Sequence, residues 1–91
     1  MPVHINILIS GKVQKIGFRY SALQVADKMN ICGFVQNLPD GKVFIEAEGD
    51  EANIENFIEW CHSGPKWAIV DFVQVEKSEM KNYSFFEIKA S

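Results

Sequence analysis

Residues 3–30, VHINILISGKVQKIGFRYSALQVADKMN, decide the fold, because a strand pattern passes directly into a helix pattern there. Apolar and polar residues alternate from Val3 to Ser10, which is typical of a half-buried β-strand. Gly11 and Gly17 then interrupt the alternation, and apolar residues recur at helical spacing from about Phe18 to Asn30. The stretch predicts a strand, a glycine-bearing loop and a helix in succession.

Further along the chain, a second pair of strand patterns is followed by a second helix. Alternation over Phe34–Asn37 and Lys42–Glu48, with a turn sequence at Leu38–Gly41 between them, predicts a β-hairpin. Asp50 is a good N-cap for the next segment, whose apolar residues have helical spacing until Gly64 and a following proline stop it.

Two extended segments close the chain and complete the predicted order. One runs from about Trp67 to Lys77, where Asp71 interrupts the alternation and suggests a β-bulge. Alternation over residues 84–88 suggests a short final strand. The sequence therefore predicts an α+β fold, a ferredoxin-like split βαβ sandwich of order βαββαβ plus a short C-terminal strand. Its two helices would cover one face of a mainly antiparallel sheet.

Composition limits the class of protein. The 91 residues, 47% of them hydrophobic, suffice for one core, so a single domain over residues 1–91 is expected. The apolar runs are too short for a membrane span and the N-terminus lacks a secretory pattern, so we expect a cytoplasmic protein without membrane contact. The net charge of -3 argues against a general nucleic-acid binder. Cys32 and Cys61 match no metal or disulfide spacing and are interpreted as small buried hydrophobic residues.

The loop between the first strand and the first helix is a candidate anion site. Helix N-termini present unpaired N–H groups and a positive dipole end. Gly17 would let the backbone curl so that amides from Gln14 to Arg19 converge on one phosphate. Arg19 is the only arginine, and its planar guanidinium suits two oxygens of one phosphate. An ordinary strand-to-helix turn explains the glycine equally well.

Asn37 is a second candidate, although its position before a turn favours ordinary turn chemistry. His4 and His62 have no nucleophile nearby in sequence, and no P-loop, dinucleotide fingerprint or metal-ligand spacing is present. Spacing alone therefore leaves the function open.

Two longer motifs resemble those of the acylphosphatase family. Residues 11–19, GKVQKIGFR, are similar to the signature G-x-V-Q-G-V-x-F-R, with Lys15 and Ile16 as the departures. Residues 33–43, GFVQNLPDGKV, followed by Gly49, match the second signature, G-aromatic-small-x-N-x-x-x-G-x-V and a later glycine. With the length and element order, the resemblance covers essentially the whole chain.

The resemblance implies an enzyme that hydrolyses the carboxyl-phosphate bond of acyl phosphates by in-line attack of water. Arg19 and Asn37 would be catalytic, the first binding the phosphate and the second orienting the water. The expected substrate-binding residues are Gln14, Lys15, Ile16, Gly17, Phe18 and Arg19. The expelled carboxylate has a conjugate acid with a pKa of roughly 4, so the reaction requires no general acid. No metal or cofactor is implied, and a monomer acting on a small acyl phosphate is expected.

Lys15, in place of the motif glycine, leaves two possibilities. With a positive φ the lysine would cost about 1–2 kcal/mol relative to glycine and disturb the neighbouring amides. The alternative function would then be a noncatalytic acylphosphatase-like phosphate-binding domain with weak activity. With a negative φ it would simply add a cation at the mouth of the site, and this is the favoured expectation. The C-terminus lacks the aromatic end seen in some family members, so its support for Arg19 stays open.

Two other proteins of the same topology are disfavoured. An RNA-binding module needs a basic sheet, but Glu46 and Glu48 would share a face with Phe44. A metal chaperone needs a Cys-x-x-Cys in the first loop, which this sequence lacks.

Overall fold

The computed structural model describes residues 1–90; Ser91, the last residue of the predicted domain, lies outside them. The elements follow the predicted order, and their bounds are β1 (Pro2–Lys12), α1 (Phe18–Lys28), β2 (Cys32–Asn37), β3 (Val43–Asp50), α2 (Glu51–Ser63), β4 (Ile69–Ser78) and β5 (Phe86–Lys89). The first helix ends two residues earlier than predicted. Asn30, with φ of 54°, has the left-handed conformation that commonly terminates helices.

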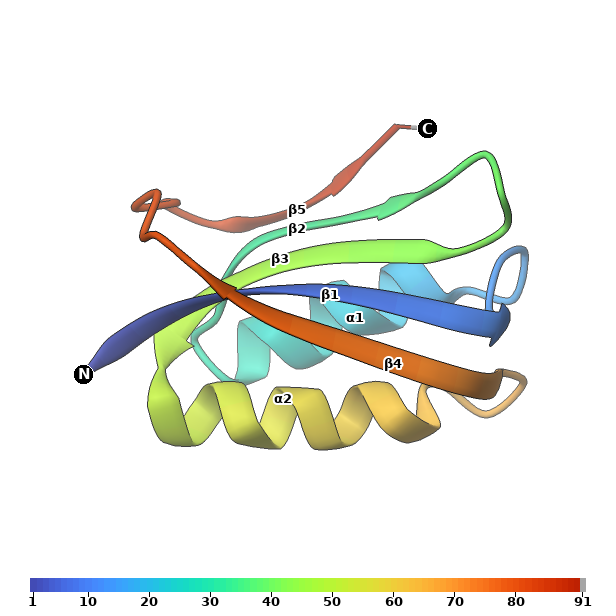
Figure 1. The fold of residues 1–91 in the computed structure, drawn as a ribbon, viewed down its shortest axis with the longest axis horizontal. Coiled ribbons are helices and arrows are strands. Elements are labelled where there is room, and N and C mark those ends of the chain that lie inside the picture. The colour runs from blue at the N-terminus through green and yellow to red at the C-terminus, as the bar shows by residue number, and fades with distance from the viewer. Residues whose placement is uncertain (91) are drawn as a thin grey trace.

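The five strands form one sheet in the order β4-β1-β3-β2-β5. Neighbouring strands are antiparallel, except that β2 and β5 run parallel. Because β1 and β2 are both antiparallel to β3, the carboxyl ends of β1, β2 and β5 lie at the same edge of the sheet (Figure 1). That edge is where the loop before α1 and the end of β2 meet.

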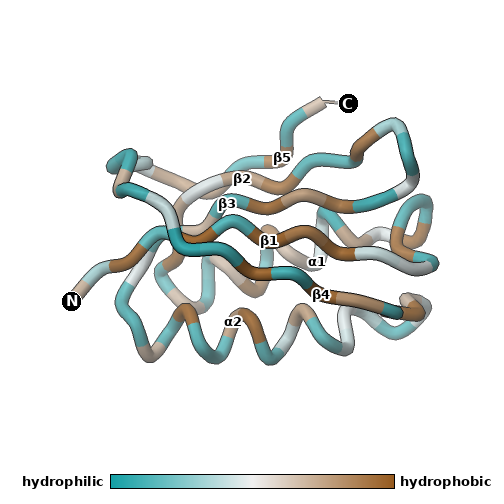
Figure 2. The backbone as a smooth tube through the Cα atoms, viewed as in Figure 1, coloured by the Kyte–Doolittle hydropathy of each residue, from teal (hydrophilic) through white to brown (hydrophobic). Residues whose placement is uncertain are grey.

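Both helices cover the same face of the sheet, as predicted (Figure 1). Alternate residues of the two central strands point into the core, and Figure 2 shows this alternation of hydrophobic and hydrophilic residues along β1 and β3. The core side chains of the central strands and helices are Ile5, Ile7, Ile9, Val43, Ile45, Ala47, Phe18, Ala22, Ala26, Ile54, Phe57 and Cys61. Each large aliphatic or aromatic side chain of this kind stabilises the fold by about 1.5–3 kcal/mol when fully buried. The fold class is therefore the predicted ferredoxin-like one.

The two cysteines differ in their surroundings. Cys61 is completely buried, and burial raises the pKa of its thiol. It therefore behaves as the small hydrophobic residue that the sequence predicts. Cys32 is only half-buried, so it fits the prediction of a small buried hydrophobic residue less well than Cys61 does.

The predicted bulge at Asp71 is confirmed. Ser10 of β1 pairs with Phe72, whereas Gly11 pairs with Val70, so Asp71 is the extra residue of β4. Gly11 has φ of 130°, and a Cβ there would collide with the carbonyl oxygen of Ile69. The bulge and this close approach bring the end of β1 against β4 just before the candidate loop.

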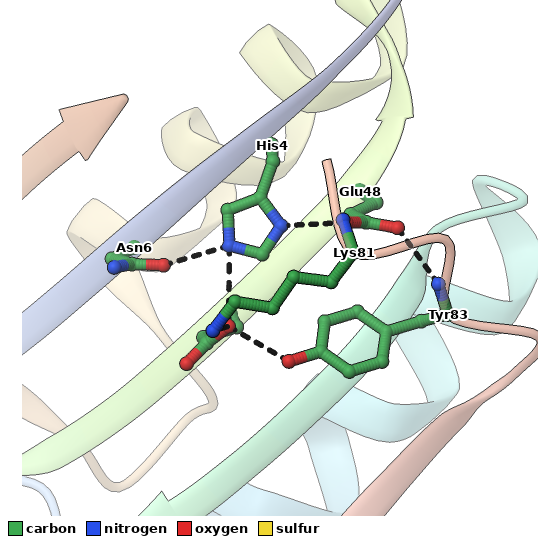
Figure 3. Close-up of polar contacts among 6 residues, drawn as sticks. His4, Asn6, Glu48, Lys81 and Tyr83 are labelled. Carbon is green, nitrogen blue, oxygen red and sulfur yellow. Dashed lines mark hydrogen bonds and ion pairs between the residues drawn. The ribbon is translucent and has the colours of Figure 1, made fainter. Parts of the chain in front are cut away.

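The face of the sheet away from the helices carries a buried polar network (Figure 3). His4 Nδ1 lies 2.7 Å from Glu48 Oε2, and His4 Nε2 lies 3.2 Å from Glu46 Oε1. The same two carboxylates accept hydrogen bonds from the segment between β4 and β5: the backbone N–H groups of Lys81 and Tyr83 donate to Glu48, and the Tyr83 hydroxyl donates to Glu46 at 2.8 Å. The network therefore fastens the segment that leads into β5.

Candidate active site

Arg19 and Asn37, the two residues predicted to be catalytic, line one pocket at the sheet edge where β1, β2 and β5 end. The pocket has a volume of about 210 Å³ and is lined by Val13, Lys15, Gly17, Phe18, Arg19, Tyr20, Asn37 and Ile88. Residues from the loop after β1, the start of α1, the end of β2 and the end of β5 thus converge. The described lining contains two cations and no carboxylate.

The loop backbone has a conformation suited to binding an anion. Lys15 has φ of 64° and Gly17 has φ of 80°, whereas Ile16 between them does not have a positive φ. Such alternation directs successive N–H groups toward one side, which forms a concave anion site. The positive φ values at Lys15 and Gly17 are therefore compatible with amides that converge on one anion.

The expectation of a negative φ at Lys15 is wrong. The alternating backbone requires a left-handed residue at this position, and the lysine takes it up at a cost of about 1–2 kcal/mol relative to glycine. Its side chain is exposed and lines the pocket, so it also supplies a cation there. Strain and added positive charge thus occur together at one residue.

The start of α1 adds to this anion site. Its N-cap is Gly17, and among the described residues no side chain caps the helix and no acidic residue lies in its first turn. The first helical hydrogen bond runs from Ser21 N–H to Gly17 C=O at 3.0 Å. The N–H groups of Phe18 to Tyr20 therefore have no partner within the helix, at the positive end of its dipole. An anion is the natural partner of such a helix terminus.

Gln14 connects the loop to the hairpin that follows Asn37. Its Nε2 donates to the carbonyl oxygens of Leu38 and Lys42, at 2.8 Å each. Of the residues predicted to bind substrate, Gln14 and Ile16 are not part of the pocket lining. The Gln14 side chain instead holds the loop against the end of β2.

Asn37 has an unsatisfied side-chain acceptor. Its Oδ1 is buried and has no hydrogen-bond partner among residues 1–90. The turn uses Asp40 instead, whose carboxylate accepts the backbone N–H of Lys42 at 3.1 Å. A buried unpaired acceptor costs about 1–3 kcal/mol. Turn formation therefore does not account for Asn37 Oδ1.

Three lining residues were missed by the sequence analysis as site residues. Val13 is buried in the loop, Tyr20 follows Arg19 on α1, and Ile88 lies on β5. Adjacency to Arg19 was the only available signal for Tyr20. Ile88 had none, because it reaches the pocket only through the pairing of β5 with β2.

The sequence model of the family described as Acylphosphatase matches residues 5–88. This chain belongs to the acylphosphatase family. It is 44% identical, over 86 residues, to an acylphosphatase of Archaeoglobus fulgidus, with 94% of this chain and 97% of that protein covered. The family assignment made from the two motifs is confirmed.

Solved structures agree with this family and fold. An acylphosphatase from Coxiella burnetii superposes with a TM-score of 0.94 at 34% identity, covering 97% of this chain and 93% of that one. An acylphosphatase from Bacillus subtilis gives 0.93 at 34% identity, covering 98% and 99%. Family and fold together support acylphosphatase activity, on the small acyl phosphates that the family hydrolyses. Neither helix among residues 1–90 has the length and apolar character needed to cross a membrane.

Proposed function

We propose that this chain hydrolyses acyl phosphates to a carboxylate and inorganic phosphate by in-line attack of water. Loop amides and Arg19 bind the phosphate, and Asn37 orients the water. The observation that carries the proposal is that Arg19, Asn37 and the uncapped start of α1 border one pocket. A monomer in the cytoplasm is the setting that we propose for this activity.

Phosphate binding is the first task of the site. Fixed donors come from the alternating backbone at Lys15 to Gly17 and from the free N–H groups at the start of α1. The Arg19 guanidinium supplies two further N–H donors in one plane. Fixed dipoles and a cation aimed at the phosphoryl oxygens stabilise charge without reorganising during the reaction. No carboxylate in the described lining opposes a dianion.

Placing the water is the second task. Asn37 Oδ1 accepts a hydrogen bond from a water molecule, which holds the water's oxygen toward phosphorus. The new bond joins the water oxygen to phosphorus, and the bond from phosphorus to the acyl oxygen breaks. Its electron pair leaves on the carboxylate, and the water's protons remain on the phosphate product. Because the leaving carboxylate is a weak base, it needs no proton donor.

The second candidate function is a phosphate-binding domain that turns over poorly. The positive φ of Lys15 favours it, because strain within the anion site can tilt the neighbouring amides. The two functions differ in a direct assay of hydrolysis.

Benzoyl phosphate hydrolysis by the wild type, Arg19→Ala and Asn37→Ala tests the proposal. Each substitution should lower kcat by about 100-fold or more, the usual loss on removing one group that stabilises or orients the transition state. Asn56→Ala, at an exposed position on α2 outside the pocket, is the matched control and should retain wild-type rates. Tight phosphate binding by the wild type without hydrolysis would support the phosphate-binding domain and refute the enzyme.

A further inference from the structure

The pocket has an apolar side that phosphate binding does not use. Tyr20 and Ile88 line it, with 61% and 38% of their surface exposed, and neither belongs to the hydrophobic core. Tyr20 adjoins Arg19 on α1. Ile88 pairs with Val35 of β2. Val35 lies two residues before Asn37, so Val35 and Asn37 point to the same face of the sheet. Two large exposed side chains from distant parts of the chain thus flank the proposed phosphate site.

We propose that Tyr20 and Ile88 bind the acyl group of the substrate, and that they make the enzyme selective for acyl phosphates with an aromatic or bulky apolar acyl group. The inference rests on the proposed hydrolysis. The phosphate end is held by the loop and Arg19, and only one oxygen separates phosphorus from the acyl carbon. The acyl group therefore lies within the pocket or at its mouth, where these two side chains are.

The chemistry of this side of the pocket selects the class of acyl group. The tyrosine ring and the isoleucine side chain offer apolar surface that a phenyl or branched alkyl group covers, which removes that surface from water. A methyl or amino group covers little of it. Contacts with a remote part of the substrate can also lower the barrier of the chemical step, so both kcat and KM respond.

The test compares kcat/KM for benzoyl phosphate and acetyl phosphate in the wild type, Tyr20→Ser and Ile88→Ser. The ratio of benzoyl to acetyl kcat/KM should fall about two- to tenfold in each serine variant, the range expected for losing one aromatic or aliphatic contact with a ring. Tyr20→Phe keeps the ring and should keep the wild-type ratio. Phe72→Ser is the matched control: Phe72 is 60% exposed, but it lies on β4, the outer strand opposite β5, and does not line the pocket.

Comparing the ratio with that of the wild type removes the intrinsic difference in reactivity between the two substrates. Thermal unfolding of each variant establishes that it is folded. A wild-type ratio in either serine variant, or an equal fall in the Phe72→Ser control, would overturn the assignment. A wild type that hydrolyses neither substrate would instead contradict the proposed hydrolysis itself, so the two failures are distinguishable.

Discussion

Arg19 is the only arginine of the chain, and at the scale of single residues it carries the most specific expectation. Arg19→Lys keeps the charge but replaces a planar fork of donors by a single ammonium group. We expect kcat/KM for benzoyl phosphate to fall about 10- to 100-fold, because bidentate contact with the phosphate is lost. Steady-state kinetics alongside Arg19→Ala measure the effect. Activity near that of the wild type would refute the bidentate role.

Lys15 combines a strained backbone with an added cation, and substitution separates the two effects. Lys15→Gly relieves the left-handed conformation, so the free energy of unfolding should rise by about 1 kcal/mol after the greater freedom of glycine in the unfolded chain is subtracted. Lys15→Ala removes the cation but keeps the strain. Both variants should raise KM for benzoyl phosphate by about two- to fivefold, consistent with a weak exposed interaction.

Urea unfolding and kinetics at low and moderate salt measure these effects. If Lys15→Gly is no more stable than Lys15→Ala, the left-handed conformation costs nothing and the strain argument fails. If Lys15→Gly increases kcat greatly while Lys15→Ala does not, strain at this residue limits turnover.

At the scale of elements, Gln14 couples the loop before α1 to the β2–β3 hairpin. Gln14→Leu removes a donor to two carbonyl oxygens and should lower the stability by about 1–3 kcal/mol. It should also lower kcat, because the loop amides and Asn37 then lose their fixed separation. Gln14→Glu, which places a carboxylate against the same carbonyls, should be worse in both respects.

Thermal unfolding and benzoyl phosphate kinetics test this coupling. Gln74→Leu is the control, because within residues 1–90 the Gln74 amide donates only to Glu76, on the exposed strand β4. A Gln14→Leu variant that loses stability but keeps the wild-type kcat would show that Gln14 supports the fold and does not position the site.

At the scale of the whole molecule, the polar network on the face of the sheet away from the helices predicts how stability depends on pH. Burial alone would raise the pKa of Glu46, but the Tyr83 hydroxyl and the Lys81 ammonium outweigh it and lower that pKa below the usual 4.5. Burial would likewise raise the pKa of Glu48. Hydrogen bonds from Lys81, His4 and Tyr83 outweigh burial, so the pKa of Glu48 is lowered. Both carboxylates therefore stabilise the fold above about pH 4.5, and this stabilisation is lost as the pH falls through their lower folded pKa values.

Unfolding midpoints in urea between pH 6 and pH 3 measure this loss. Glu46→Gln should flatten the acid side of the profile, whereas Glu55→Gln, at an exposed position on α2, should leave its slope unchanged. An unaltered slope in Glu46→Gln would contradict the role of the network.

The same network predicts a loss of stability in base. Burial, together with the hydrogen bond to Glu46, raises the pKa of Tyr83 from 10.0 to about 12. The neutral hydroxyl stabilises the fold fully below about pH 10, and this contribution is lost as the pH rises toward 12. Tyr83→Phe should remove this dependence in urea unfolding between pH 9 and pH 12. If the Tyr83→Phe profile is identical to that of the wild type, ionisation of Tyr83 does not cause the loss of stability in base.

Sequence alone determined the order of the elements, the buried faces of β1 and β3, the bulge at Asp71, and the family. These features depend on periodicity, glycine and short motifs, which act over a few neighbouring residues. The candidate roles of Arg19 and Asn37 also came from motifs and stay predictions. The pocket shared by these two residues follows from the parallel directions of β1 and β2, which the predicted topology already contained.

Only the tertiary structure decided the left-handed conformation of Lys15, the partners of Gln14, and the presence of Ile88 beside the pocket. A lysine rarely adopts positive φ by its own preference, so its conformation depends on the surrounding loop. Gln14 and Leu38 are 24 residues apart in sequence, and Ile88 is farther still from the loop. Contacts of this kind form only when strands pack side by side, so no local pattern encodes them.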